Sequence, residues 1–166
     1  MQRFIVTGGN RGLGFALARH IAATPDAEVV LAVRDPDSGR RAAQEIGANA
    51  SVMELDLADG ASVNRFAEAV DGPVAGLVNN AGIQIANETR ETADGFEETF
   101  AVNHLNALKL TLGLRDRLRG GRVMFIGSGT HNPRHPTATR FGFRGEQFRS
   151  IENCARGLNS ADDIGQ

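Results

Sequence analysis

The sequence predicts an α/β fold in which one parallel sheet carries helices on both of its faces. Strand-like and helix-like patterns alternate through the first 128 residues. The run Glu28–Val33 (EVVLAV) is apolar almost throughout, which is typical of a strand covered on both faces. A glycine-rich turn, Thr7–Gly14 (TGGNRGLG), joins the first apolar run to a helical pattern. Because strands separated by helices form right-handed crossovers, these observations favour a doubly wound parallel sheet.

The first half of the chain contains three strand–helix pairs. Leu13, Leu17 and Ile21 form one apolar stripe in the first helix, and a proline shortly afterwards ends it. An Asp-Pro pair opens the second helix and a glycine closes it. The expected elements are the strands Arg3–Val6, Glu28–Val33 and Ala50–Leu55, and the helices Gly12–Ala23, Asp35–Ile46 and Gly60–Val70.

The second half contains one long helical region between two strands. We expect its buried face at Leu105, Leu108 and Leu112, and two glycines end it. The last strand (RVMFI) would be an exposed apolar edge, so we expect it to be covered by the tail or by formation of a homo-oligomer. The expected elements are the strand Val74–Val78, the helix Ala93–Leu118 and the strand Arg122–Ile126.

The periodic pattern ends near residue 128, so we expect residues 1–128 to form one domain and residues 129–166 to be irregular. A segment of that length without periodicity is typical of a lid, a disordered tail or a truncated element. The scattered arginines of this tail are interrupted by acidic residues, which favours a solvated segment over a nucleic-acid contact.

The overall composition excludes several classes of partner. The formal net charge of −2 gives no electrostatic reason to expect nucleic acid or an anionic membrane. No apolar run is long enough to span a bilayer, and the first residues enter a strand without a leader, so we expect a cytoplasmic protein. The single cysteine, Cys154, cannot form an internal disulfide.

The turn after the first strand has the features of a phosphate-binding loop. Gly8, Gly12 and Gly14 lack a Cβ atom, so the backbone can turn tightly and approach a phosphate. The following helix presents unpaired N–H groups and the positive end of its dipole. The sequence therefore predicts a site for the pyrophosphate of a dinucleotide.

Four further motifs follow this turn in order. They are Asp56-Leu57 after the third strand, Asn79–Gly82 (NNAG) at the fourth, Asn103 in the long helix and Ser128 after the fifth. With the Gly-x3-Gly-x-Gly spacing of the turn, these motifs resemble the short-chain dehydrogenase/reductase family, and the segment GSGTH resembles its retinol dehydrogenase-like and protochlorophyllide reductase-like branches. The resemblance implies a Rossmann fold with strand order 3-2-1-4-5, truncated before the family's later strands.

The resemblance also implies a cofactor and a reaction. Members of the family transfer hydride between a nicotinamide dinucleotide and the carbonyl or alcohol of a small-molecule substrate. The residues that it implies for cofactor binding are Thr7, Gly8, Asn10, Arg11, Gly12, Leu13, Gly14, Arg34, Asp56, Leu57, Asn80, Ala81 and Gly82.

The end of the second strand bears on the choice between NADP and NAD. In the family, an acidic residue there holds the adenosine 2′-OH and selects NAD. Arg34 is well placed here instead, and Arg11 adds a second cation inside the glycine turn. Because a guanidinium can bind a phosphate bidentately, we predict NADP. The adjacent Asp35 could contact a ribose hydroxyl, which keeps NAD open as the less favoured cofactor.

The catalytic half of the family pattern is incomplete. The pattern implies an asparagine, a serine, a tyrosine and a lysine, of which Asn103 and Ser128 have matching positions. The chain has no tyrosine, and its single lysine, Lys109, precedes the serine. His131 and His135 could carry a proton near neutral pH, but nearby prolines oppose the helix that would orient them. The same prolines argue against a zinc pair, so no metal site is expected.

Three functions stay open at this point. The chain could be an oxidoreductase of this family whose site is completed in a longer protein or by a partner. It could also be a non-catalytic dinucleotide-binding sensor, or an inactive fragment.

Overall fold

A computed structural model of the chain describes residues 1–85, 88–128, 134, 136, 140 and 150–156. Five strands form one sheet in the order β3-β2-β1-β4-β5, and every neighbouring pair is parallel. This order confirms the predicted doubly wound topology. The strands are β1 (Gln2–Thr7), β2 (Ala27–Val33), β3 (Ala50–Glu54), β4 (Gly76–Asn79) and β5 (Arg122–Phe125).

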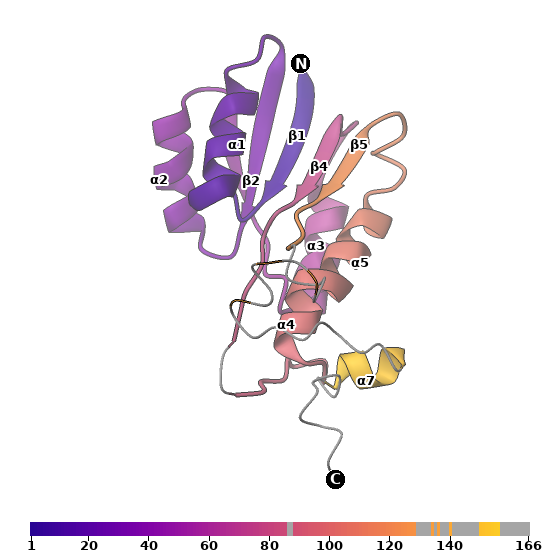
Figure 1. Cartoon of the computed structure of the whole chain (residues 1–166). Coiled ribbons are helices and arrows are strands. Elements are labelled where there is room, and N and C mark those ends of the chain that lie inside the picture. Colours follow the sequence, from indigo (N-terminus) through magenta and orange to yellow (C-terminus); the bar gives the residue numbers. More distant parts are fainter. Residues whose placement is uncertain (86–87, 129–133, 135, 137–139, 141–149, 157–166) are drawn as a thin grey trace.

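Helices cover both faces of this sheet. Figure 1 shows α1 and α2 on one face and α3 and α5 on the other. The helices are α1 (Gly12–Ala22), α2 (Pro36–Ile46), α3 (Gly60–Ala69), α4 (Glu98–Phe100), η1 (Ala101–Leu105), α5 (Asn106–Gly113) and α7 (Ile151–Ala155).

The core consists of two apolar layers, one on each face of the sheet, and successive residues of a strand belong to each layer in turn. Ile5 of β1 packs in the layer under α3 and α5, whereas the next residue, Val6, packs in the layer under α1 and α2. Successive residues of a strand point to opposite faces, so a strand inside this sheet needs apolar residues at every position. This requirement explains the unbroken apolar run of β2, whose residues 29–33 are all buried.

Hydrogen-bonding side chains fix where α2, α3 and α4 begin. The Asp59 carboxylate accepts a hydrogen bond of 2.8 Å from the backbone N–H of Ala61 in the first turn of α3. This bond, supported by a second from Ser62, holds the pKa of Asp59 below its usual value.

The long helix predicted over Ala93–Leu118 is shorter in the structure and is not uniform. It begins at Glu98, where the Glu97 carboxylate accepts hydrogen bonds from two N–H groups, and α5 ends at Gly113. Between α4 and α5 lies one π-helical turn, η1, in which the N–H of Asn106 donates to the carbonyl of Ala101. A π-helical turn inserts an extra residue into a helix, and helical periodicity in the sequence does not reveal it.

The predicted buried face of this helix is wrong. Leu108 and Leu112 are 41% and 59% exposed, and the buried positions include Ala107, Leu110 and Leu114. Leucines recur at helical spacing on both sides of α5, so the sequence pattern fits either side. The position of the helix over the sheet decides which side is buried.

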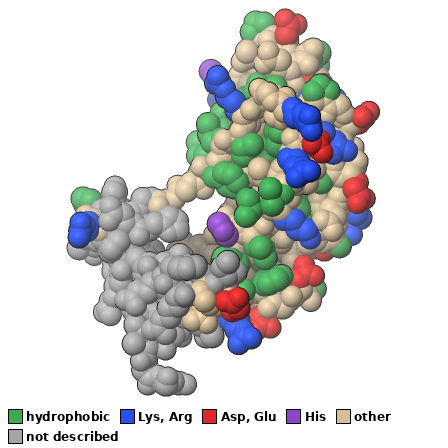
Figure 2. All heavy atoms as spheres, turned by 90° about the vertical axis from the view of Figure 1, so that its right-hand side faces the viewer, with side chains coloured by type: hydrophobic (Ala, Val, Ile, Leu, Met, Phe, Trp, Pro, Cys, Tyr) green, Lys and Arg blue, Asp and Glu red, His purple; other side chains and the backbone are tan. Residues whose placement is uncertain are grey.

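The exposed leucines of α5 adjoin a second group of exposed hydrophobic side chains, which lies on β5. Figure 2 shows hydrophobic side chains gathered on the side of the molecule where α5 and β5 lie. Within the described residues β5 is an edge of the sheet, and the exposed side chains there are Leu108, Leu112, Val123, Met124, Phe125 and Ile126. An edge of this kind is the expected place for a covering segment or a second subunit, and homo-oligomerisation stays a prediction.

Part of the segment predicted to be irregular is helical, and its described residues include the helix α7. The N–H of Glu97 donates a hydrogen bond of 2.7 Å to the carbonyl of Ala155, which ties α7 to the start of α4. His131 and His135 lie outside the described residues. None of the described helices is both long and apolar enough to cross a membrane.

Candidate functional site

A crevice of about 580 Å³ opens at the carboxyl ends of the central strands. In a doubly wound sheet this is the edge at which ligands bind, since the strand order reverses there. The structure brings all of the predicted cofactor-binding residues into its lining: Thr7, Gly8, Asn10, Arg11, Gly12, Leu13, Gly14, Arg34, Asp56, Leu57, Asn80, Ala81 and Gly82.

Thr7 joins the ends of β1 and β4 beneath this crevice. Its side chain is fully buried, and its hydroxyl oxygen accepts hydrogen bonds from the N–H groups of Asn80 and Ala81 at 3.0 and 2.9 Å. In return, the Asn80 side-chain amide donates to the Thr7 carbonyl at 2.9 Å. These bonds fix the NNAG segment against the glycine turn, so the two motifs form one rigid wall.

Replacing Thr7 with valine is expected to destabilise this wall. Valine has the same shape but cannot accept a hydrogen bond, so two partly buried N–H groups lose their partner at a cost of up to about 1–3 kcal/mol. Urea unfolding followed by circular dichroism measures this loss. Thr7→Ser, which keeps the hydroxyl, is the matched control, and an equal loss in both variants would contradict the assigned role.

The start of α1 provides an open cradle for an anion. Gly12 has a left-handed backbone (φ +55°), and a Cβ placed on it would meet no atom within 4 Å. Arg11, the residue before the helix, is extended and its side chain does not cap the helix. The first N–H groups of α1 therefore face the crevice with the positive end of the helix dipole behind them.

Gly14 allows α1 to approach the wall closely. A Cβ at this position would lie 2.4 Å from the Asn80 side-chain nitrogen and 2.5 Å from the Gly8 carbonyl oxygen. The predicted apolar stripe of α1 is wrong at Leu13, which is 61% exposed and lines the crevice. The first turn of the helix faces this opening rather than the core.

Two arginines, Arg11 and Arg34, line the crevice. Arg11 and Arg34 are both exposed there, and neither forms an ion pair within the part of the chain that the structure describes. The neighbouring Asp35 carboxylate accepts hydrogen bonds from the N–H groups of Asp37 and Ser38 at 3.0 and 3.3 Å. Asp35 is thus engaged as the N-cap of α2, whereas the guanidinium groups remain available to a ligand.

A side-chain contact links the glycine turn to α2. The Asn10 amide donates a hydrogen bond of 2.9 Å to the hydroxyl oxygen of Ser38, which also lines the crevice. Asn10 thereby holds the turn beside the N-terminus of α2, close to the two arginines. This contact joins residues 28 positions apart, so no local sequence signal predicts it.

The far wall is formed by the segment after β3. One Asp56 carboxylate oxygen accepts a hydrogen bond from the N–H of Ala58 at 2.8 Å, and the N–H of Asp56 donates to the buried Ser62 hydroxyl at 3.0 Å. The carbonyl of the next residue, Leu57, accepts a hydrogen bond of 2.8 Å from the Asn106 side chain. Asp56 is half-buried and lies at the mouth of the crevice.

The two predicted catalytic residues, Asn103 and Ser128, are not among the residues that line the crevice. Asn103 lies in η1, where its side-chain amide both accepts from and donates to the backbone of Ile83 at 2.8 Å. Ser128 is exposed and follows β5, whose chain is held to β4 by a hydrogen bond from Ile126 N–H to the Asn79 carbonyl. The π-helical turn thus turns the Asn103 side chain toward the segment after NNAG.

Sequence reasoning did not assign several residues that line the crevice. Ser38 lies near the start of α2 and Glu98 at the start of α4, and tertiary packing decides that both face the crevice. Val102 lies in the π-helical turn η1, which helical periodicity does not reveal. Asp35, considered from the sequence as a contact of a ribose hydroxyl, also lines the crevice, and the lining residues that were not predicted for cofactor binding are Ala32, Val33, Ser38, Leu55, Ile83, Glu98 and Val102.

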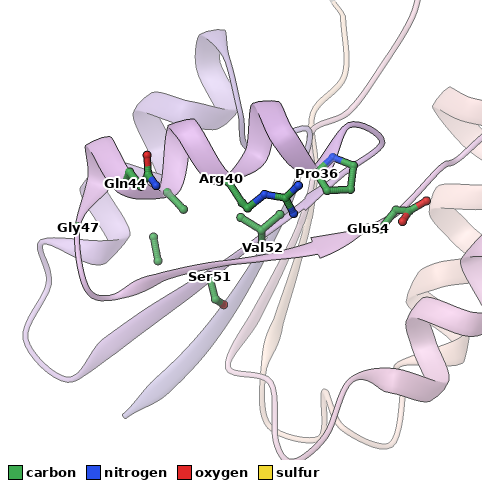
Figure 3. Close-up of a pocket in the computed structure, with 9 residues that line it drawn as sticks. Pro36, Arg40, Gln44, Gly47, Ser51, Val52 and Glu54 are labelled. Carbon is green, nitrogen blue, oxygen red and sulfur yellow. The ribbon is translucent and has the colours of Figure 1, made fainter.

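A second hollow lies between α2 and the outer edge of β3. Figure 3 shows Arg40 and Pro36 on α2 above Val52 of β3. Arg40 is paired with Asp37, and the hollow runs along a strand edge rather than across strand ends. It lacks the glycine turn and unpaired cations of the crevice, and no cluster of metal-ligating side chains occurs among the described residues.

Comparisons with known proteins agree with this arrangement. A family model described as short chain dehydrogenase matches residues 2–140. A protein of Streptomyces lividans described as a probable oxidoreductase is 38% identical over 154 residues, covering 89% of this chain and 50% of that protein. Retinol dehydrogenase 12 of Bos taurus is 39% identical over 139 residues, covering 77% of this chain and 43% of that enzyme.

Solved structures share the same architecture. A blue fluorescent protein from a metagenomic library, solved in complex with NADPH, matches with a TM-score of 0.66 and 32% identity, over 78% of this chain and 57% of that one. The chain spans at most half the length of these curated relatives.

Proposed function

The chain belongs to the short-chain dehydrogenase/reductase family and is retinol dehydrogenase-like within it, and on this basis we propose that it binds NADP(H) in the crevice. The proposed activity is hydride transfer to or from the carbonyl or alcohol of a small molecule. The proposed cofactor-binding domain is residues 1–128.

The residues of the crevice fit a dinucleotide. The pyrophosphate would lie at the start of α1, where Gly12 leaves open space and the Arg11 side chain does not cap the helix. The adenosine half would extend over β2 and β3 toward Asp56 and Leu57. The nicotinamide half would extend over β4 and β5, where Asn103 and Ser128 lie.

The observation that carries the choice of NADP is the charge distribution at the end of β2. Arg11 and Arg34 face the crevice without ionic partners among the described residues, while Asp35 caps α2. A 2′-phosphate would gain charge-assisted hydrogen bonds from these guanidiniums, whereas a ribose hydroxyl would gain little. The NADPH complex of the blue fluorescent protein supports the same choice by similarity.

The bound cofactor would supply the hydride, and the protein would position and polarise the reactants. Ser128 would donate a hydrogen bond to the substrate oxygen. Asn103 would act as a positioning residue, because its side chain already holds the backbone of Ile83 beside the nicotinamide side. The family pattern implies a tyrosine as the proton donor, and this sequence contains no tyrosine.

Titration with reduced cofactor tests the proposed binding. NADPH added to the protein should give saturable fluorescence enhancement, with a dissociation constant below that of NADH. Crystals soaked with NADPH that showed the crevice empty or filled by protein would overturn the proposal.

We expect no measurable turnover from this chain alone. The reaction needs a group that exchanges a proton with the substrate oxygen, and the single lysine is engaged with the Gly60 carbonyl at 2.9 Å. Absorbance of NADPH with a panel of aldehydes and ketones measures the rate. Robust oxidation that His131→Ala or His135→Ala abolishes would instead show that a histidine supplies the proton.

A further inference from the structure

We infer that Asn106 is a positioning residue that sets the affinity of the crevice for the adenosine half of its ligand. This inference rests on the proposed function. Asn106 lies outside the lining of the crevice, at the start of α5, and only 4% of it is exposed.

The side chain of Asn106 bridges two parts of the chain that no secondary structure connects. Its amide donates a hydrogen bond of 2.8 Å to the carbonyl of Leu57, a residue 49 positions away that is 5% exposed and lines the crevice. One helical turn further along α5, Lys109 donates to the carbonyl of Gly60 at 2.9 Å. Hydrogen bonds from two side chains of α5 therefore hold the segment Leu57–Gly60 against that helix.

The π-helical turn makes this contact possible. The N–H of Asn106 donates to the Ala101 carbonyl, five residues earlier, so the helix is locally wider and the side chains after it are rotated. As a result, Asn103 reaches the segment after β4 while Asn106 reaches the segment after β3. One short stretch of helix thus holds two walls of the crevice.

The segment held by Asn106 carries the groups that an adenosine would meet. Leu55, Asp56 and Leu57 line the crevice next to Arg34, which is the proposed 2′-phosphate contact. On its other side this segment is tied by the Asp56 N–H to the Ser62 hydroxyl. If the Leu57 carbonyl lost its buried donor, it would turn toward water and carry Asp56 with it, which would widen the adenosine end of the crevice.

The test compares Asn106→Leu with Thr111→Val. Leucine keeps the volume of Asn106 and removes the donor to Leu57. Thr111 lies on the same helix as Asn106, and Thr111→Val removes the hydrogen bond of 3.0 Å that its hydroxyl accepts from the Asn79 side chain of β4; neither Asn79 nor Thr111 lines the crevice. The probe is adenosine 2′,5′-bisphosphate, titrated by calorimetry. In this measurement a partly unfolded variant lowers the binding stoichiometry but leaves the dissociation constant of the folded protein unchanged.

We expect Asn106→Leu to raise the dissociation constant of this probe by roughly fivefold or more, since an unpaired buried carbonyl has a cost of that order. Thr111→Val should leave it unchanged. Hydrogen exchange of the free protein should also quicken at the Asp56 and Ala58 amides in Asn106→Leu alone. Asn106→Ser, whose hydroxyl is too short to reach Leu57, replaces the leucine variant if that variant does not fold.

Two results would overturn the inference. One is an unchanged dissociation constant in the Asn106 variant, and the other is an equal increase in both variants. Failure of the unsubstituted protein to bind the probe would count against the proposed function, and the exchange rates at Asp56 and Ala58 would then decide whether Asn106 holds this segment.

Discussion

Gly14→Ala is expected to weaken the affinity for NADPH by about 10- to 100-fold, which is the equivalent of losing one or two charge-assisted hydrogen bonds to the pyrophosphate. The added Cβ would lie 2.4 Å from the Asn80 side chain and 2.5 Å from the Gly8 carbonyl, so α1 must move away from both. That movement withdraws the helix N–H groups from the proposed pyrophosphate position. Overpacking of this kind also lowers the free energy of unfolding by about 1–3 kcal/mol.

Fluorescence titration with NADPH, together with urea unfolding, separates the two effects. Gly127→Ala is the matched control, because a Cβ there would meet no atom within 4 Å and no left-handed backbone is involved. The prediction would be wrong if the Gly14→Ala protein unfolded at the same urea concentration as the parent and bound NADPH equally well. That result would show that α1 tolerates the added methyl group beside Asn80 and Gly8.

Arg34→Ala is expected to weaken NADPH binding by about 10- to 100-fold, which is the equivalent of losing one or two charge-assisted hydrogen bonds. NADH lacks the 2′-phosphate, so its affinity should fall by much less. Raising the salt concentration should reduce the difference between the two cofactors in the parent protein, because Arg34 is exposed and its field is screened.

The control for this variant is Arg41→Ala. Arg41 is exposed on α2, carries the same charge and does not line the crevice. It therefore reports any general effect of removing a cation near the site. If Arg34→Ala weakened NADPH and NADH equally, the argument for a 2′-phosphate contact would fail.

The strands and the glycine turn after β1 were predictable because their signals are local. The apolar run of β2 needs two covered faces, and the glycines after β1 need a tight turn beside a helix N-terminus. Both requirements involve residues adjacent in the chain. The parallel sheet and the family followed from the order of these motifs, and both are confirmed.

The ends and the buried face of the long helix could not be predicted from local signals. Its length was overestimated because residues 93–97 have helical spacing but form a turn, with Gly95 at φ +79°. Its buried face was misassigned because two leucine stripes compete, and only the sheet beneath α5 selects Leu110 and Leu114 over Leu108 and Leu112.

The sequence by itself determined the order of strands and helices, the place of the glycine turn and the residues gathered around it, because each depends on neighbours within a few positions. Only the tertiary structure decided that Asp35 caps α2 while Arg34 faces the crevice, and that Asn103 and Asn106 hold two separate walls. These choices depend on hydrogen bonds between residues distant in the chain, made where buried polar groups must find partners. No periodicity encodes such pairings, since they exist only once the sheet and its helices have packed together.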